Sequence, residues 1–279
     1  YPEQVSYFTL QIKKDQKFTH GKKLAVTMGV KKASHEWLLF TDADCYPVSK
    51  NWIRSMARNF DEQTAVVLGY GGYKRQGGFL NSMIRFDTLT IALQYFSYAL
   101  RGFPYMGVGR NLAYRKSLFF NNKGFAGHYH MESGDDDLFV NQTAVKSNTR
   151  VQISHDSVVM SEPHHTFTNW FKQKSRHLTT ASFYKGKTKF GLLTEVISRF
   201  LFYVAFVLTL VFFTGYYPYI LGIFLIRLIV QVIDYKGIMN RVGEKNLLFT
   251  VLFYDILIPF INFMGIIRNK IASNNHQWN

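Results

Sequence analysis

The sequence predicts an α/β domain followed by helices that cross a membrane. Up to about Gly191, short apolar runs alternate with amphipathic stretches, which is the pattern of α/β domains. Residues 200–214 are then almost entirely apolar, and residues 216–233 repeat this pattern. Aromatic residues make up 17% of the chain and concentrate in its last third, which favours a bilayer environment. We therefore expect an α/β domain at 1–190 and a membrane region of two or three helices at 191–271.

Composition limits the possible partners. A formal net charge of +15 suits nucleic acid, an anionic membrane face or phosphorylated substrates. The basic residues are spread along the chain and no nucleic-acid recognition motif occurs, so we expect no nucleic-acid partner. Cys45 is the only cysteine, which excludes an intrachain disulfide. The chain begins at Tyr1 without a signal peptide, and we interpret it as a piece of a longer protein.

Four segments of the first domain carry clear local signals. Apolar residues at helical spacing predict a helix over residues 21–33. The continuous apolar run at residues 37–40 is typical of a buried parallel strand, which we expect to end at Thr41. Residues 65–68 repeat that signal, whereas residues 151–153 alternate like a half-exposed strand. Residues 81–100 predict a long core helix, to which we assign no chemical role.

The membrane spans differ in how clearly they are marked. Crossing the hydrocarbon layer takes about 20 apolar residues, and the first span reaches that length only if residues 192–199 are included. A third apolar segment, residues 247–267, contains three residues unusual for a simple span: Asp255, Pro259 and Asn262. This segment crosses the bilayer, lines a channel or lies in the interface, and the sequence leaves all three alternatives open.

Loop charges predict the orientation. Lys185, Lys187 and Lys189 precede the first span, whereas residues 215–218 between the two spans carry no charge. Basic residues mark the cytoplasmic side of membrane proteins. We therefore expect an integral membrane protein with a cytoplasmic α/β domain, in the cell membrane if the source is bacterial.

An acidic pair follows the first predicted strand. In Thr41-Asp42-Ala43-Asp44, the two carboxylates lie two residues apart, so that in an extended or turning segment they point the same way. Asp42 and Asp44 can then share one hard divalent cation, or reach the cation and a ribose together. The alternative is a solvated turn, which is the commoner meaning of an isolated pair of this kind.

A second acidic cluster occurs about ninety residues later, in Ser133-Gly134-Asp135-Asp136-Asp137-Leu138. Like charges this close raise one another's pKa, which suits one of them to accept a proton from a hydroxyl group. Capping of the helix that follows is the alternative, and the two roles are compatible.

The order of four motifs resembles that of family 2 glycosyltransferases. These are Asp42-Ala43-Asp44, Gly109-Arg110-Asn111, Gly134-Asp135-Asp136-Asp137 and Gln173-Lys174-Ser175-Arg176-His177. The layout covers residues 1–180 and is similar to cellulose, chitin and hyaluronan synthases and to ceramide glucosyltransferases. The resemblance implies a GT-A fold, a Rossmann-like mixed sheet, that lacks its first strands here, with residues 5–10 as the next strand.

The resemblance also implies a role for each motif. Asp42 would contact the donor nucleotide and Asp44 a divalent cation, Mg²⁺ or Mn²⁺. Asp136 would be the catalytic base, with Asp135 as the alternative. Gln173 and Arg176 would hold the donor diphosphate. The acceptor pocket would be lined by three consecutive residues, Gly109, Arg110 and Asn111.

One position and two residue pairs depart from the family pattern or match it weakly. The synthases end the last motif with Trp where this chain has His177, which favours a single transfer over processive polymerisation. Lys22 and Lys23 at the start of a helix resemble the family's lysine near the diphosphate, with Lys22 as the donor-binding candidate, although paired lysines also fit a solvated helix face. His164 and His165 are candidates for a third metal ligand or a gate, and equally for a surface pair.

Together these features predict a glycosyltransferase, and the resemblance implies that it inverts the anomeric carbon. It would move a sugar from a nucleotide-diphosphate donor, such as a UDP-sugar, to a hydroxyl of a lipid-linked or polysaccharide acceptor in cell-envelope glycan synthesis. The alternatives are a processive polysaccharide synthase and a non-enzymatic membrane scaffold or transport component.

Overall fold

The computed structural model describes residues 8–12, 21–129, 131 and 133–275, the last four of these by their backbone alone. The strands are β1 Trp37–Phe40, β2 Cys45–Pro47, β3 Val66–Leu68, β4 Gly71–Tyr73, β5 Leu112–Arg115, β6 Thr149–Val151 and β7 Val159–Ser161. The α-helices are α1 Gly21–Lys32, α2 Trp52–Ala57, α3 Phe79–Leu100, α4 Lys116–Asn121, α5 Asp137–Thr143, α6 Phe167–Leu178, α7 Gly186–Phe212, α8 Tyr217–Val242 and α9 Val251–Asn275.

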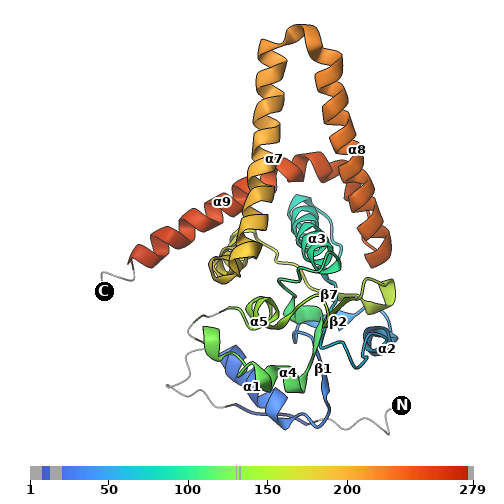
Figure 1. Ribbon diagram of the computed structural model, residues 1–279, viewed down its shortest axis with the longest axis vertical. Helices are drawn as coiled ribbons and strands as arrows, with labels where there is room; N and C mark the ends of the chain where they lie inside the picture. Colours follow the sequence, from blue (N-terminus) through green and yellow to red (C-terminus); the bar gives the residue numbers. More distant parts are fainter. Residues whose placement is uncertain (1–7, 13–20, 130, 132, 276–279) are drawn as a thin grey trace.

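Two small mixed sheets form the centre of the domain, which confirms the α/β class. One has the order β1-β5-β3-β6 and the other β2-β7-β4. In each sheet one neighbouring pair is parallel, β3 with β6 and β4 with β7, and the other pairs are antiparallel. The sheets lie below α3, with α1 and α4 at the far end from the membrane helices (Figure 1).

The prediction that residues 37–40 form a parallel strand is wrong. β1 pairs antiparallel with β5, Trp37 lying opposite Arg115, and it ends at Phe40 rather than Thr41. The run is apolar throughout because its two faces pack on different clusters: Leu38 and Phe40 contact the main core, whereas Trp37 and Leu39 contact the small cluster around Met56. Two-sided packing, not strand direction, produced the signal.

Three other predictions on the α/β domain were close to the observed elements. The helix predicted over 21–33 is α1, and the strand predicted at 65–68 is the fully buried β3. The strand predicted at 151–153 lies two residues earlier, as β6. The strand predicted over 5–10 falls partly outside the described residues, and its described part, residues 8–10, belongs to no strand.

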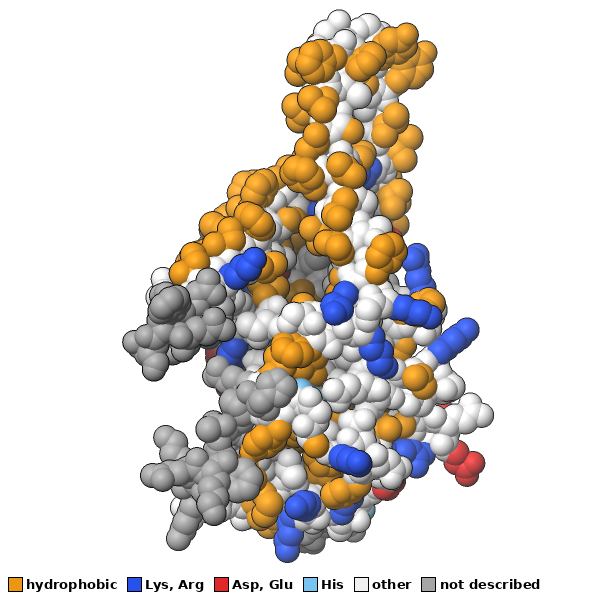
Figure 2. Space-filling view, turned by 60° about the vertical axis from the view of Figure 1, so that its left-hand side comes forward, with side chains coloured by type: hydrophobic (Ala, Val, Ile, Leu, Met, Phe, Trp, Pro, Cys, Tyr) orange, Lys and Arg blue, Asp and Glu red, His pale blue; other side chains and the backbone are white. Residues whose placement is uncertain are grey.

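Helices α7 and α8 form a hairpin that projects away from the sheets (Figure 1). Both are long and apolar enough to cross a membrane, and the apolar window of neither is buried within the protein. Figure 2 shows their hydrophobic side chains covering the projecting hairpin. A surface of this kind requires a non-aqueous surrounding, because exposed apolar patches of this size are rare in soluble proteins. The two predicted spans are therefore present as an unpartnered apolar hairpin.

Helix α9 has the same apolar length but lies differently. It runs across the base of the hairpin (Figure 1) and packs against α6, α3 and α8. Its Asp255 carboxylate accepts hydrogen bonds from Tyr203 at 2.7 Å and Arg227 at 2.8 Å and forms an ion pair with Arg199 at 3.2 Å. These contacts tie α9 to both arms of the hairpin. Asp255, the acidic residue within the third apolar segment, is thus a charge paired with residues of two neighbouring helices.

A buried ion pair joins the end of α8 to α3. Glu244 accepts hydrogen bonds from Arg85, through Nε at 3.0 Å and through Nη2, and from the Tyr70 hydroxyl at 3.3 Å. The side chains of Arg85 and Glu244 are 5% and 2% exposed, so neither charge has water as an alternative partner.

We expect Glu244→Ala to lower the free energy of unfolding by roughly 3–5 kcal/mol, because it leaves the Arg85 guanidinium buried and unpaired. Thermal unfolding in detergent micelles measures this. Glu62→Ala, which removes an exposed carboxylate, is the control and should change stability by less than about 0.5 kcal/mol. Equal melting temperatures for the two variants would contradict the expectation.

Candidate active site

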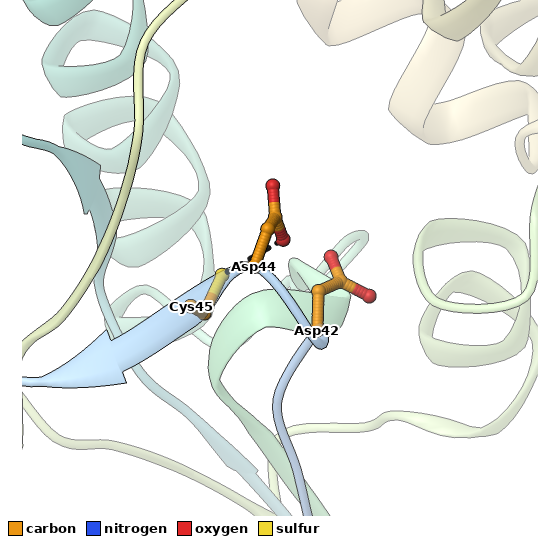
Figure 3. A group of neighbouring side chains, drawn as sticks. All are labelled: Asp42, Asp44 and Cys45. Atoms are coloured by element: carbon orange, nitrogen blue, oxygen red, sulfur yellow. Dashed lines mark hydrogen bonds between the residues drawn. The ribbon is translucent and has the colours of Figure 1, made fainter.

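The acidic turn between β1 and β2 presents both predicted carboxylates to one side (Figure 3). Asp44 is exposed, and its Oδ2 accepts a hydrogen bond from the Ser161 hydroxyl at 3.0 Å. Ser161 lies on β7, opposite Cys45 of β2, so strand pairing fixes the position of this carboxylate. Ligand atoms of Asp42, Asp44 and Cys45 lie within 4.8 Å of one another. The turn therefore has the spacing of a metal site.

The chemistry of these three residues favours a hard cation. Burial and the neighbouring Asp44 carboxylate raise the pKa of the Cys45 thiol to about 11, so that it stays protonated at neutral pH. A protonated thiol is a poor ligand, whereas two carboxylates suit Mg²⁺ or Mn²⁺. Asp42 and Asp44 can thus hold such an ion without the cysteine.

Lys22 on α1 connects the two acidic clusters. Its Nζ lies 3.0 Å from Asp135 Oδ2 and 3.3 Å from Asp42 Oδ1. Burial disfavours the ammonium, but the carboxylates of Asp135, Asp136 and Asp42 outweigh this effect and raise the pKa of Lys22. A permanent positive charge therefore lies between carboxylates that are some ninety residues apart in sequence.

The adjacent lysine has a different role. Lys23 is fully buried, and its Nζ donates to the backbone oxygens of His128 at 2.6 Å and Met131 at 2.8 Å. Burial lowers the pKa of Lys23. It holds the loop that precedes the second acidic cluster, so of the two lysines only Lys22 reaches the predicted site.

Asp136 occupies the N-cap of α5. Its Oδ1 accepts a hydrogen bond from the Asp137 amide at 2.8 Å, and its Oδ2 accepts one from the Gly109 amide at 2.6 Å. A Cβ at position 109 would lie 3.2 Å from Asp136 Oδ2, so a glycine suits this approach. Burial, then the carboxylates of Asp135 and Asp137, raise the pKa of Asp136 to about 7. The capping role and a proton-accepting role thus coexist in one residue.

The third acid of the cluster faces inward. Asp137 Oδ2 accepts hydrogen bonds from the hydroxyls of Thr180 and Tyr184, the latter at 2.8 Å. Its Oδ1 accepts one from the Leu138 amide. Burial raises the pKa of Asp137 in spite of these hydrogen bonds. Because its oxygens are occupied within the protein, Asp137 links α5 to the segment after α6 and is a structural residue.

Helix α6 carries the last predicted motif. Thr166 is its N-cap residue, and the Thr166 hydroxyl accepts a hydrogen bond from the Asn169 amide. Gln173 Oε1 accepts a hydrogen bond from the Tyr73 hydroxyl at 3.3 Å and lies 3.0 Å from His164 Nε2. Burial and the nearby Arg176 lower the pKa of His177 to about 4, so its imidazole is neutral. Four polar residues of α6 line one cavity, and the histidine among them is neutral: Gln173, Lys174, Arg176 and His177.

A buried ion pair fixes α6 against α3. Lys174 Nζ donates to both carboxylate oxygens of Asp87 at 2.7 Å, and the two side chains are each 7% exposed. Asp87 was not expected at the site, because no chemical role was predicted for the helix at 81–100. The available signal was that Asp87 is the only acidic residue in α3.

Arg110 and Asn111 take different places. The Arg110 guanidinium lies 4.4 Å above the Tyr73 ring and donates to the Gly72 oxygen at 3.3 Å. Asn111 is fully buried, donates to the backbone oxygens of Tyr70 and Ser157, and accepts from the Trp52 indole. Asn111 does not line the cavity described below, because its amide instead holds strands together.

One cavity of about 400 Å³ collects most of the predicted residues, a size in the usual range of small-molecule sites. It is lined by Lys22, Asp42, Asp44, Gly109, Arg110, Asp136, Gln173 and Arg176. His164 also lines it, but the group of potential metal ligands found among the described residues contains neither His164 nor the exposed His165. Asp135 is not among the lining residues, and its carboxylate pairs with Lys22.

The fold and the cavity define a class: an α/β enzyme with attached apolar helices whose site combines carboxylates with basic side chains that suit a phosphorylated substrate. The sequence model of glycosyl transferase family 21 matches residues 4–279, nearly the whole chain, and the protein belongs to this family. No curated protein matches the chain. The predicted glycosyltransferase is thereby confirmed; the match is to family 21, and it does not show membership of family 2 specifically.

Proposed function

We propose that this glycosyltransferase transfers a single sugar, with inversion, from a nucleotide-diphosphate donor to a hydroxyl of a lipid-linked acceptor. The observation that carries the proposal is the shared cavity, in which Asp136 lies with the acidic turn and the cationic side chains of Lys22 and Arg176. A carboxylate with a pKa near neutrality can accept the acceptor's proton. The cations can stabilise the departing diphosphate, and the α/β domain would correspond to a GT-A domain.

The residues of the acidic turn fit a resident divalent cation, and Asp42 and Asp44 would hold it. When bound, Mg²⁺ or Mn²⁺ supplies positive charge that neutralises the donor diphosphate. Lys22, which already contacts Asp42, would orient the same phosphates, and Arg176 can bind them through its planar fork. No covalent intermediate is required, because Asp136 acts on the acceptor hydroxyl directly.

A lipid-linked acceptor is favoured over a polysaccharide by what borders the cavity. Leu192 of α7 and Asn262 of α9 line it, so it reaches the helices that are apolar enough for a membrane. A single transfer is favoured because the last motif ends in the neutral His177, where the synthases resembled have Trp. The lysines at the start of α7, Lys185, Lys187 and Lys189, would place the domain on the cytoplasmic side.

The decisive experiment measures nucleotide release and glycolipid formation by the full-length protein in membranes, with a panel of nucleotide sugars. We expect one donor to support transfer to a lipid hydroxyl, with loss of activity in EDTA and recovery on addition of Mg²⁺ or Mn²⁺. Transfer that persists in EDTA would refute the metal, and formation of long polysaccharide chains would refute single transfer.

We expect kcat/KM to rise with pH through about 7, because Asp136 accepts a proton only as a carboxylate and its pKa is raised to about 7. Below that value the rate should fall about tenfold per pH unit, as the carboxylate fraction falls. Initial rates between about pH 5 and about pH 9, which span the raised pKa of Asp136 on both sides, measure the profile. A flat acidic limb would contradict Asp136 as the base.

We expect the protein to stay in the membrane fraction after extraction with alkaline carbonate, because the long apolar segments of α7 and α8 are not buried within the protein. Burial of two such helices in lipid exceeds the affinity of peripheral attachment. Immunodetection in pellet and supernatant measures the distribution. Release of the intact protein into the supernatant would contradict an integral membrane protein.

A further inference from the structure

Helix α9 is apolar enough to cross a membrane, but both of its halves contact the α/β domain. Near its start, the Tyr254 hydroxyl donates to the backbone oxygen of Phe79, the first residue of α3, at 3.3 Å. Near its end, Asn269 Nδ2 donates to the Ser175 backbone oxygen of α6 at 2.5 Å. Along a helix these two contacts lie about 22 Å apart. A helix that crossed the bilayer would leave the domain over this length, whereas α9 follows the domain surface.

Close packing on α6 holds the second half of α9. A Cβ at Gly265 would lie 2.8 Å from Leu178 Cδ1, so glycine permits this approach. The Arg268 guanidinium lies 5.9 Å above the Phe171 ring, which also belongs to α6. Of the apolar window of α9, 33% is buried within the protein, whereas the windows of α7 and α8 are not buried at all. The inner face of α9 is therefore part of the packing of the domain.

The opposite face of α9 is apolar and uncovered. Five residues at helical spacing, here called the outer stripe, are each between 41% and 61% exposed: Phe253, Ile256, Phe260, Phe263 and Ile267. The residues between them that point inward, such as Ile258 and Ile261, are buried. Soluble domains rarely expose a continuous apolar patch of this length. We therefore expect the outer stripe to meet a non-aqueous surrounding.

The lipid that surrounds the hairpin can also cover the outer stripe. Figure 2 shows hydrophobic side chains continuing from the projecting hairpin onto the slanting helix at its base. Asp255 of α9 pairs with Arg199 of α7 and Arg227 of α8, which fixes α9 to both arms. The tip of the hairpin carries exposed tyrosines, among them Tyr216 and Tyr219, and tyrosine favours a membrane interface. The hairpin thus reaches one interface at its tip, and its base with α9 lies towards the other.

Basic residues indicate on which side α9 ends. Exposed pairs occur at the start of α7, after the end of α8 and near the end of α9: Lys187 and Lys189, Arg241 and Lys245, and Arg268 and Lys270. Residues 213–219 at the tip of the hairpin include no charged residue. If α9 crossed the bilayer, its basic pair would lie with the uncharged tip. Along the domain surface the pair joins the other basic residues, as the distribution of charge in membrane proteins favours.

We propose that α9 does not cross the bilayer and instead lies along its surface on the side of the α/β domain. The outer stripe then lies among the lipid acyl chains, and Arg268 and Lys270 lie at the level of the lipid phosphates, which attract them. Within the part of the chain that the structure describes, only the α7–α8 hairpin crosses. The partner of this face is the lipid monolayer, and α6 with its donor motif lies directly beneath it. This arrangement is independent of the reaction at the cavity.

The first test measures on which side of the membrane each segment lies. Single cysteines are introduced in the full-length protein after Cys45→Ser removes the native thiol, and the variants are placed in sealed vesicles with the domain outside. A membrane-impermeant maleimide should label Glu62→Cys on the domain and Lys270→Cys after the outer stripe to the same extent. Gly215→Cys at the hairpin tip should be labelled only after detergent is added. If Lys270→Cys also requires detergent, α9 crosses and the proposal is overturned.

The second test identifies what covers the outer stripe. A nitroxide spin label at Phe263→Cys should collide more often with oxygen, which dissolves in lipid, than with an aqueous nickel chelate. Lys270→Cys, two turns further along the same helix, is the matched control and should show the reverse. Greater collision with the nickel chelate at Phe263→Cys would place the stripe in water and refute the lipid contact. Dipolar broadening that disappears on dilution with unlabelled protein would show that a second copy covers the stripe, which also refutes it.

Discussion

Asp136→Asn should lower kcat by roughly 10²–10⁴-fold, the usual contribution of a positioned general base, and leave donor affinity nearly unchanged. Asparagine keeps the shape of the side chain and its Oδ1 can still cap α5 through the Asp137 amide. It cannot accept a proton. The variant should also lose the acidic limb of the pH profile, because that limb reports the ionisation of Asp136. Single-turnover rates and donor titrations measure the two parameters separately.

Asp135→Asn and Asp137→Asn are the matched controls, since each removes one charge from the same cluster. Asp135 is the alternative base from the sequence, but its carboxylate pairs with Lys22 and does not line the cavity. Asp137→Asn should chiefly lower thermal stability, because it disturbs the hydrogen bonds from Thr180 and Tyr184. If Asp135→Asn abolishes turnover and Asp136→Asn preserves it, Asp135 is the base. If all three variants stay active, the cluster is structural.

Asp44→Ala should lower kcat/KM by roughly 10²–10³-fold, the size of effect seen when one electrostatic stabiliser of a transition state is removed. The exposed Asp44 carboxylate is held by Ser161 and lies with Asp42 at the spacing of a cation site. Calorimetry with Mn²⁺ and donor should show the loss of metal-dependent binding. Asp156→Ala, at an exposed position outside the cavity, should leave binding and rate unchanged.

A change of metal preference would tie this effect to the ion itself. Asp44→Cys replaces a hard oxygen with a softer sulfur ligand, so activity with Mg²⁺ should be lost and partly recovered with Cd²⁺ or Zn²⁺. Asp44→Ala should show no such recovery. Unchanged metal-dependent donor binding in Asp44→Ala would place the ion elsewhere, and His164, which lines the same cavity, would be the next candidate.

The class of enzyme followed from the sequence alone, and most of the site residues expected from the sequence line one cavity. Asp42, Asp44 and Asp136 were found because short motifs act through spacing within a turn or at a helix start, and such geometry is local. The two spans of the hairpin were found for the same kind of reason, since apolar length decides whether a segment suits a bilayer. The order of the four motifs along the chain then predicted a glycosyltransferase.

Other assignments depended on contacts between distant segments. Asp135, Asp136 and Asp137 are chemically identical in sequence, yet their surroundings differ. Asp135 pairs with Lys22, whereas Asp136 and Asp137 both line the cavity. Asp136 accepts a hydrogen bond from the Gly109 amide, and Asp137 accepts hydrogen bonds from the Thr180 and Tyr184 hydroxyls. The direction of β1 was predicted wrongly because an apolar run records burial on two faces and not the neighbour to which the strand is hydrogen-bonded.

The sequence by itself determined the α/β class, the acidic motifs and the apolar hairpin, because each is encoded by residues close together in the chain. Only the tertiary structure decided which acid meets which cation, that Asp87 fixes α6, and that α9 packs beneath the hairpin with Asn262 at the cavity wall. The physical reason is that charge pairing, burial and cavity lining depend on which segments approach one another, and that approach is set by packing of the whole chain.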